Sequence, residues 1–340
     1  MGFAGYLIRR LGMSVLVIFG VALLVFVSSR LVPSDPAALF AGPRPTADQI
    51  EATRALLHLD ESVWSQFASF IKAMATGDFG VSYRTRQLIW NDLAVFLPAT
   101  LELALFATLL ALAFGIPLGV LTADRQGGVV DRLTGFGAVA AVAMPTFFLA
   151  MLLQFVFAQW LHLLPLAGRQ SQEIALFNPV APITGSLLID SVLRGRPDAL
   201  WDAVKHLILP ALTLAAYPAG VAVRLTRSLM AEILERRHIT AARALGLPHG
   251  QILFRHALPN AIGPTLTIIG LSFAFSLTGA VLVEIIFAWP GLGRYLSDAI
   301  LSKDFPVIAS STLVVTLCYV GMNLIIDILQ AVIDPRVTVA

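Results

Sequence analysis

Six long apolar runs alternate with polar segments along the chain. They cover residues 11–29, 98–122, 135–161, 207–230, 261–288 and 306–333. The shortest run holds 19 residues, and a helix of about 20 residues crosses the hydrocarbon core of a bilayer. The pattern therefore predicts an all-α integral membrane protein with six transmembrane helices.

The polar segments divide the chain into three predicted parts. Residues 1–30 form an N-terminal tail and the first helix, residues 31–97 a small extracytoplasmic segment, and residues 98–340 a five-helix membrane core. Within the second part, Thr46 and Gln49 have the spacing of a capping box. This spacing predicts an amphipathic helix from Ala47 to Leu57.

The first apolar run admits a second interpretation, as a cleaved signal peptide. Its length argues against cleavage, and the following SSRLVPSD lacks the small-x-small pattern of a cleavage site. Because Arg9 and Arg10 precede the run, we expect a retained helix with a cytoplasmic N-terminus.

The loop between the fourth and fifth runs fixes the predicted orientation. Total Lys and Arg counts do not differ enough between the two sides, but the positive-inside rule applies to short loops. We place this loop in the cytoplasm, so six spans put both termini there. Its arginines are Arg224, Arg227, Arg236, Arg237, Arg243 and Arg255.

Composition agrees with a membrane protein and narrows the possible chemistry. The chain is 57% hydrophobic and 13% charged, with a mean hydropathy of +0.82, whereas soluble domains are roughly 25% charged. A net charge of +2 is too small to indicate nucleic-acid binding. The single cysteine, Cys318, can form neither an internal disulfide nor a thiolate metal cluster.

Motifs of catalysis are absent from the sequence. None of the three lysines, Lys72, Lys205 and Lys303, follows a glycine, so no phosphate-binding GxxxxGK[ST] loop is present. The chain also lacks HExxH and GxSxG. A membrane-embedded hydrolase is therefore disfavoured, as is a channel, because no segment resembles a selectivity filter.

Charged residues and prolines interrupt the apolar runs. Glu102, Glu284 and Asp327 are costly in lipid. Snorkelling of Glu102 and Glu284 to the headgroups is as reasonable as lining a path, and we expect Asp327 to pair with Asn323 or to lie near a cytoplasmic helix end. Kinks are expected at Pro117, Pro145, Pro218 and Pro264.

The most charged stretch of this apolar chain is RRHITAARALGLPHGQILFRHALPN, residues 236–260. Good helix formers from Ala231 to Leu245 followed by Gly246 predict one helix that ends in a glycine turn. A second short helix is expected over 251–257, before Pro259 interrupts it. Small residues at Ala241, Ala242 and Ala244 favour a helix that docks in a groove of another protein, and a basic loop with no partner is the alternative.

This stretch resembles a known signature. ITAARALG followed by RHALPN is similar to the cytoplasmic motif of permease subunits in binding-protein-dependent ABC importers, in which it forms the helix that couples to the ATPase. Thr240 stands where that family often has Glu. The resemblance implies a coupling region at 231–257, with coupling residues Thr240, Ala241, Ala242, Arg243, Ala244, Gly246 and Leu247.

Other segments resemble the branch of the family that imports dipeptides, oligopeptides or nickel. They are GDFGVSY at 77–83, LPATLELALFA at 97–107 and EIIFAWPGLGRYLSDAI at 284–300, the last expected to be a helix end, a Trp-Pro-Gly turn and a short amphipathic helix. The resemblance implies the type I permease fold in a bacterial plasma membrane, and half of a path for peptides, with nickel or another small solute as the alternative. Candidates for lining that path are Ser276, Thr278 and Glu284.

The same resemblance implies a set of partners. They are a second similar permease, two cytoplasmic ATPase subunits and an extracytoplasmic solute-binding protein, besides membrane lipid. ATP and Mg²⁺ are expected in the ATPase subunits, and no cofactor, metal or nucleic acid is expected on this chain.

Overall fold

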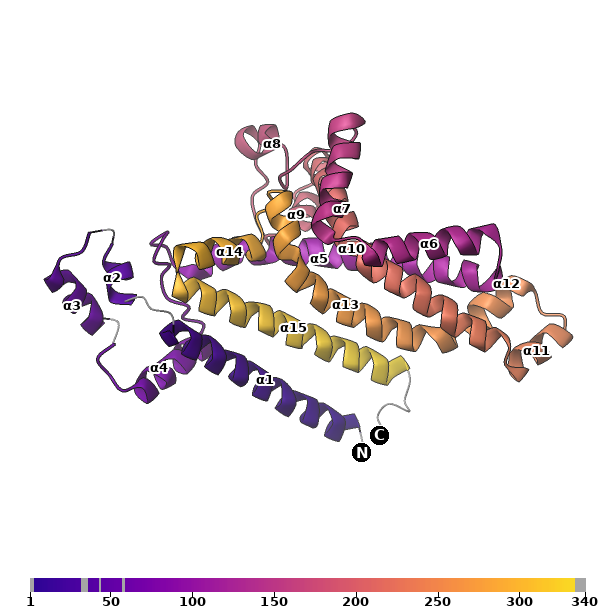
Figure 1. The fold of residues 1–340 in the computed structure, drawn as a ribbon, viewed down its shortest axis with the longest axis horizontal. Helices are drawn as coiled ribbons and strands as arrows, with labels where there is room; N and C mark the ends of the chain where they lie inside the picture. The colour runs from indigo at the N-terminus through magenta and orange to yellow at the C-terminus, as the bar shows by residue number, and fades with distance from the viewer. Residues whose placement is uncertain (1–2, 32–35, 43, 57–58, 334–340) are drawn as a thin grey trace.

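The computed structural model describes the chain except residues 1–2, 32–35, 43, 57–58 and 334–340. The described part is built from helices, with an isolated bridge between Val81 and Leu88. Five of the helices are long and run roughly side by side (Figure 1). They are α1 (Phe3–Leu31), α5 (Ile89–Asp124), α10 (Pro197–Leu234), α13 (Leu258–Ile286) and α15 (Phe305–Ile333).

Four of these helices are long and apolar enough to cross a membrane: α1, α5, α10 and α15. A bent pair of shorter helices qualifies as a fifth crossing. Several side chains of α13 lie outside the described residues, although the helix itself is 29 residues long. The all-helical membrane fold is confirmed, and the count of six spans stays a prediction.

The predicted third span is broken rather than continuous. Residues 135–161 divide into α6 (Val129–Ala143), α7 (Thr146–Leu153) and the π-helical η1 (Gln154–Trp160), with a bend of 113° between α6 and the following segment. The break falls at Met144 and Pro145, which are both extended. A proline kink was expected here, but the bend is sharp enough to separate two helices.

The segment after α1 folds into three short helices: α2 (Pro36–Ala41), α3 (Ala47–Leu56) and α4 (Val63–Thr76). The capping box is confirmed, because the Thr46 N–H donates to Gln49 Oε1 at 3.0 Å and the Gln49 N–H donates to Thr46 Oγ1 at 3.3 Å. The expected last residue of this helix, Leu57, lies outside the described residues.

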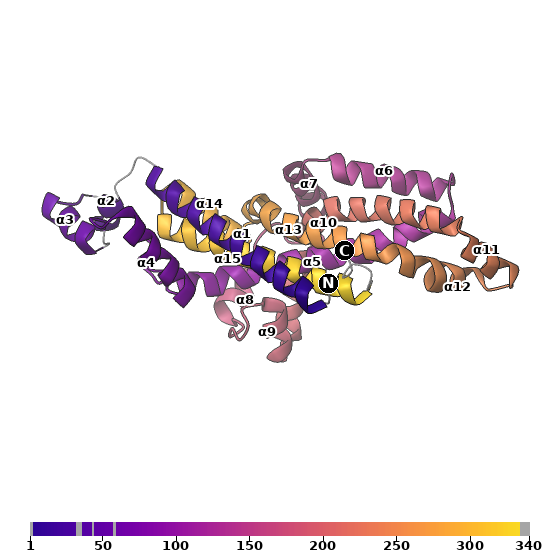
Figure 2. The same cartoon turned by 90° about the horizontal axis from the view of Figure 1, so that it is seen from below.

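Further short helices rise from the middle of the molecule's length (Figure 1). Between η1 and α10 are α8 (Gln172–Phe177) and α9 (Leu187–Leu193), which stand apart from the long helices (Figure 1). The predicted turn after α13 is confirmed, since α13 ends at Ile286 and α14 (Leu292–Ser302) begins after the Trp-Pro-Gly sequence. Seen from below, α1 and α15 overlie the α5 region (Figure 2).

Two glycines allow α5 to approach α10 closely. A β-carbon at Gly115 would lie 2.6 Å from Cβ of Ala222, and one at Gly119 would lie 2.5 Å from Cβ of Thr226. Glycines four residues apart lie on one helix face, the small-xxx-small pattern that lets membrane helices pack backbone to backbone. The close contact of α5 with α10 therefore depends on the absence of side chains at these two positions.

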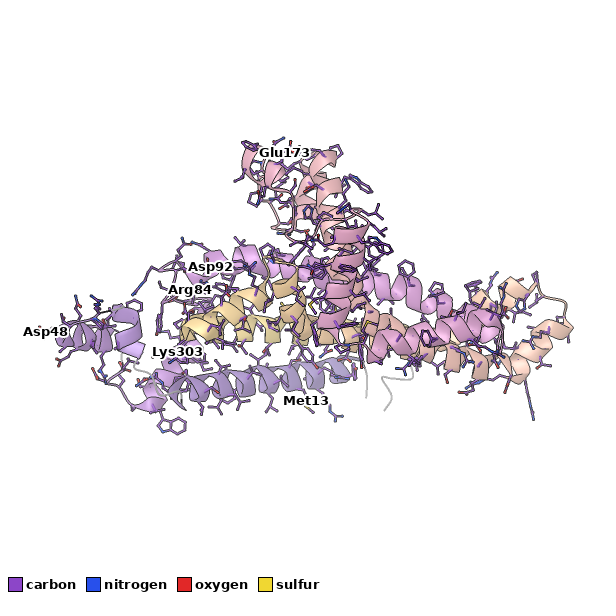
Figure 3. All side chains as sticks on the ribbon, turned by 45° about the horizontal axis from the view of Figure 1, so that its top comes forward. Met13, Asp48, Arg84, Asp92, Glu173 and Lys303 are labelled. Atoms are coloured by element: carbon purple, nitrogen blue, oxygen red, sulfur yellow. The ribbon has the colours of Figure 1, made fainter. Side chains whose placement is uncertain are left out.

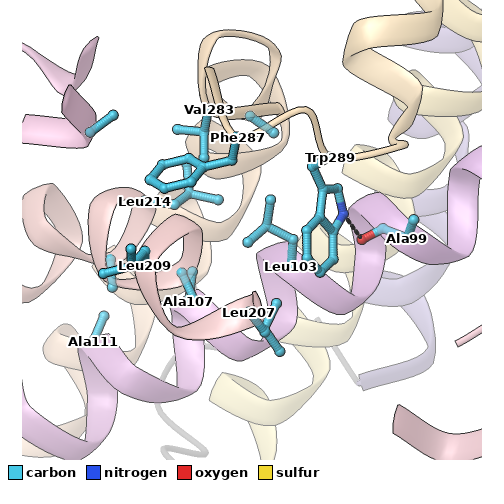
Figure 4. Close-up of a cluster of buried hydrophobic side chains, with 14 residues drawn as sticks. Ala99, Leu103, Ala107, Ala111, Leu207, Leu209, Leu214, Val283, Phe287 and Trp289 are labelled. Carbon is cyan, nitrogen blue, oxygen red and sulfur yellow. Dashed lines mark hydrogen bonds between the residues drawn. The ribbon is translucent and has the colours of Figure 1, made fainter. Parts of the chain in front are cut away.

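The largest buried cluster lies where α5, α10 and the end of α13 meet (Figure 4). Trp289 is fully buried there, and its indole N–H donates to the Ala99 carbonyl oxygen at 3.0 Å. Leu103, Leu207 and Phe287 pack in the same cluster. The Trp-Pro-Gly turn is thus anchored to the first half of α5.

We predict that Gly119→Leu destabilises the protein, because an added side chain must push α10 away. Overpacking of this kind costs about 1 to 3 kcal/mol, which a lower midpoint of thermal unfolding in detergent would report. The control is Gly20→Leu in α1, since a β-carbon at Gly20 meets nothing within 4 Å. Equal effects of the two substitutions would contradict the packing role of Gly119.

Candidate functional site

One end of the molecule, called the tip below, is a short helical hairpin beyond the end of α10, at the right of Figure 1. It contains α11 (Arg237–Ala244), α12 (His249–Gln251) and the π-helical η2 (Ile252–Ala257). The predicted single helix over 231–245 is wrong in one respect: α10 ends at Leu234, and Arg236 is extended with φ −71° and ψ 150°. The tip helix α11 is therefore separate from α10.

The inner face of α11 is anchored in a hydrophobic cluster. Ile239 is fully buried and Ala242 is buried beside it. The cluster draws residues from α5, α10, η2 and α13, so four other segments support α11. Its buried members are Val120, Ala123, Met230, Ile233, Leu234, Ile239, Ala242, Ile252, Leu253, Ala257 and Ala261.

The outer face of α11 is exposed in the described part of the chain. Thr240, Ala241, Arg243 and Ala244 are exposed, as predicted coupling residues should be. Ala242 corrects the expected small-residue face, because it points into the cluster and offers nothing to a partner. The sequence reasoning also missed Leu245, which is 80% exposed at the end of α11.

Gly246 ends α11 in a left-handed turn, as predicted, with φ 74°. The Gly246 N–H donates to the Arg243 carbonyl at 3.0 Å, and the Leu247 N–H donates to the Ala242 carbonyl at 3.3 Å. These two bonds form a Schellman motif, in which the residue after glycine packs back on the helix. Leu247 accordingly packs against the inner cluster instead of joining the exposed face.

The second part of the tip runs into the membrane core without interruption. Pro259 was expected to break the helix after residue 257, but it occupies the first turn of α13, where a proline needs no hydrogen-bond partner. At the start of α12, His249 Nε2 lies 2.7 Å from the Asp124 carboxylate at the end of α5. The tip is therefore tied to α5 by an ion-pair contact as well as by packing.

Glu102 holds the segment between η1 and α10, called the outer segment below, against α5. Its side chain is 4% exposed, and Arg169 approaches it at 3.0 Å. The Ser186 hydroxyl and the Leu188 N–H also donate to this carboxylate, at 2.5 Å and 3.2 Å. Arg169 in turn donates to the Gly185 carbonyl at 2.9 Å. The snorkelling considered for Glu102 is therefore wrong.

A second carboxylate shapes the loop that Glu102 holds. Asp190 accepts hydrogen bonds from the backbone N–H groups of Ile183, Thr184 and Gly185, and from the Thr184 hydroxyl. Burial alone raises the pKa of Asp190, but the bonds from Thr184 and its neighbours bring it below its usual value. The loop before α9 is thus organised around an ionised side chain.

Glu284 is fully buried at the end of α13, so snorkelling is wrong for this residue too. The Thr100 hydroxyl donates to its carboxylate at 2.6 Å, and the Arg294 N–H donates at 2.8 Å. A β-carbon at Gly291 or Gly293 would collide with the carboxylate. The glycines of the Trp-Pro-Gly-Leu-Gly sequence therefore make room for Glu284, and its protein partners leave it no free surface toward a path.

The remaining candidates lie in different surroundings. Ser276 is buried and its hydroxyl has no hydrogen-bond partner in the described part of the chain. The side chain of Thr278 lies outside the described residues. Asp327 pairs with Arg10 of α1 at 3.0 Å, which replaces the expected pairing with Asn323. A path-lining role for Ser276 and Thr278 stays a prediction.

A cavity of about 210 Å³ lies at the break between α6 and α7. Pro145 and Thr146 of the break line it, together with Thr213 and Tyr217 of α10 and Gly279 of α13. Pro145 provides no side-chain cap for α7. Among the described residues, no group of three or more His, Cys, Asp or Glu side chains could hold a metal ion.

Two family models cover the chain. Residues 115–339 match the binding-protein-dependent transport system inner membrane component, and residues 3–104 match its N-terminal model. The chain belongs to this family. It is therefore a multi-pass inner-membrane transport component and not an enzyme, and it works with a solute-binding protein and ATPase subunits.

Relatives of the chain match it over nearly its whole length. It is 41% identical to a probable D,D-dipeptide transport system permease protein of Escherichia coli, over 95% of this chain and 94% of that protein. It is 38% identical to the dipeptide transport system permease protein of Alkalihalophilus pseudofirmus, over 98% of both chains. A glutathione transport system permease protein of Escherichia coli is 35% identical, over 98% of both.

We predict that Leu245→Ala weakens binding of the ATPase subunit about tenfold, as expected when a protruding apolar anchor is removed. Binding is measured by titrating the purified ATPase onto the permease in nanodiscs. The control is Leu301→Ala, because Leu301 is similarly exposed but lies in the last turn of α14, far from the tip (Figure 1). If both variants bind the ATPase as the parent does, Leu245 is not an anchor.

Proposed function

We propose that this chain forms half of the translocation path for dipeptides or oligopeptides in an ATP-driven importer. The observation that carries this proposal is the near full-length identity with permeases named for dipeptide transport. The exposed face of α11 supports it, because the inner face of this helix packs in a hydrophobic cluster while Thr240, Ala241 and Arg243 on the outer face are exposed. Nickel is not favoured, since the names of these relatives refer to dipeptides or glutathione.

The proposed assembly contains a second similar permease, two ATPase subunits and a solute-binding protein. Exposed apolar side chains on α6, α7 and η1 support a permease partner or lipid on that side: Leu133, Phe136, Val139, Phe147, Phe155 and Trp160. Asp48 and Arg84, which lie toward the end opposite the tip, and Glu173, on the part that rises from the long helices, would face the binding protein (Figure 3). ATP and Mg²⁺ would be held by the ATPase subunits, with no cofactor on this chain.

In this proposal, closure of the ATPase subunits moves α11 and the membrane helices follow. The cluster beneath α11 and the contact of His249 with Asp124 link the tip to α5. Arg227 of α10 makes two hydrogen bonds to Asp131 of α6, at 2.6 Å and 2.8 Å. Movement of α10 would therefore carry α6, and with it the break at Pro145, in the manner of rigid-body switching.

Transport itself is the first test. We predict that vesicles containing this chain, its partner permease and the ATPase take up labelled dipeptide only when ATP and loaded binding protein are both supplied. The chain purified alone should hydrolyse no ATP. Vesicles without the ATPase subunits are the control, and uptake of Ni²⁺ in place of dipeptides would reject the proposed substrate.

Orientation is the second test, since both termini are proposed to be cytoplasmic. Single cysteines at Phe177 and Leu245, in a Cys318→Ser background, would be exposed at opposite ends, because the native side chains are 84% and 80% exposed. We predict that an impermeant thiol reagent added to intact cells labels only Phe177→Cys. After permeabilisation both sites should react, and labelling of Leu245→Cys in intact cells would reverse the topology.

A further inference from the structure

A cavity of about 360 Å³ lies between the outer ends of α1 and α15 and the face of α4. This volume lies within the range of about 300 to 1,000 Å³ that is typical of ligand pockets. Its apolar walls come from four separate segments: Phe26 of α1, Phe70 of α4, Phe79 of the following loop, and Pro306 of α15. None of these residues belongs to the tip or to the cavity at the break between α6 and α7.

The aromatic wall of the cavity packs against an apolar span. The ring of Phe67 on α4 contacts Phe19 and Phe26 of α1, at centroid distances of 5.8 Å and 5.1 Å. Both α1 residues belong to the apolar span Ile8–Arg30. The aromatic face of α4 therefore packs against a membrane-crossing segment.

The helix α1 exposes most of its apolar surface, as a helix in contact with lipid does. Only 11% of the apolar window of α1 is buried within the chain. Met13 points away from the bundle (Figure 3), and Leu16 and Leu24 are mostly exposed as well. Met13 and Leu24 lie on the side of α1 opposite to Phe26, so lipid surrounds most of α1 up to the end where Phe26 and Arg30 line the cavity.

One end of the cavity is polar. Arg30, in the last turn of α1, donates to the Gln66 side chain, and its guanidinium lies 5.2 Å from the centre of the Phe26 ring. Tyr83 lines the same end, and burial raises its pKa to about 12, so its hydroxyl stays protonated. The Asp78 carboxylate also lines the cavity and accepts the Gly80 N–H at 3.1 Å. A cation above aromatic walls matches an amphiphile with an anionic head.

We propose that this cavity binds one phospholipid of the adjacent leaflet, with an acyl chain against Phe26 and Phe70 and the phosphate toward Arg30. The lipid fixes α4, and with it the small helices of residues 36–76, to the outer ends of α1 and α15. This binding site is separate from the peptide path, so the proposal does not depend on the transported substrate.

The test uses the assembled transporter in nanodiscs that contain a phospholipid with a photoreactive acyl chain. After illumination, mass spectrometry of peptides should find the label on α4 between residues 66 and 74. Ala73→Trp fills the cavity, because Ala73 lines it, and should abolish this labelling. Arg30→Gln should reduce it about tenfold, the expected loss of a charged hydrogen bond to phosphate, whereas Arg30→Lys should retain most of it.

Ala68→Trp is the matched control, since Ala68 is an exposed alanine of the same helix and does not line the cavity. It should label as the parent does. Equal labelling of the Ala73→Trp and Ala68→Trp variants would overturn the proposal. So would a result in which Ala73→Trp leaves lipid labelling intact but prevents docking of the binding protein, because the occupant would then be that protein.

Discussion

The close approach of α5 and α10 is the contact on which the rest of the structure depends. At Gly115 and Gly119 the two backbones come near enough that a single added carbon would collide. The helix α10 extends over 38 residues, from the outer segment to the tip. Its position against α5 therefore sets the positions of the outer segment and of the tip. Packing with small residues provides this contact where the hydrophobic effect gives no drive between helices in lipid.

The tip continues the same packing beyond the ends of α5 and α10. Val120 and Ala123 of α5, and Met230 and Ile233 of α10, continue the helix contact and receive Ile239 of α11. A push on the exposed face of α11 therefore acts on a packed unit, since close-packed interiors transmit displacement and do not absorb it. The turn at Gly246 fixes the direction in which that face points.

Local signals were predictable from the sequence, and distant contacts were not. The capping box at Thr46, the left-handed Gly246 and the turn before α14 depend on residues a few positions apart. The burial of Ala242 depends on four other segments, and the partner of Glu284 is Thr100, 184 positions away. Asp327 likewise pairs with Arg10 rather than with a neighbour one turn away. Periodicity indicated the spans, but proline statistics do not specify a 113° bend at Pro145.

The placement of polar groups also bears on how a solute could pass. Glu102 and Glu284, the two acidic residues predicted near span ends, are each satisfied by protein donors. Their charge is therefore used to hold the outer segment and the Trp-Pro-Gly turn, and little of it is available to a passing molecule. The break at Pro145 differs, because α7 begins there without a side-chain cap beside a cavity. Backbone groups at a helix break bind many related solutes, which suits a permease whose binding protein selects the peptide.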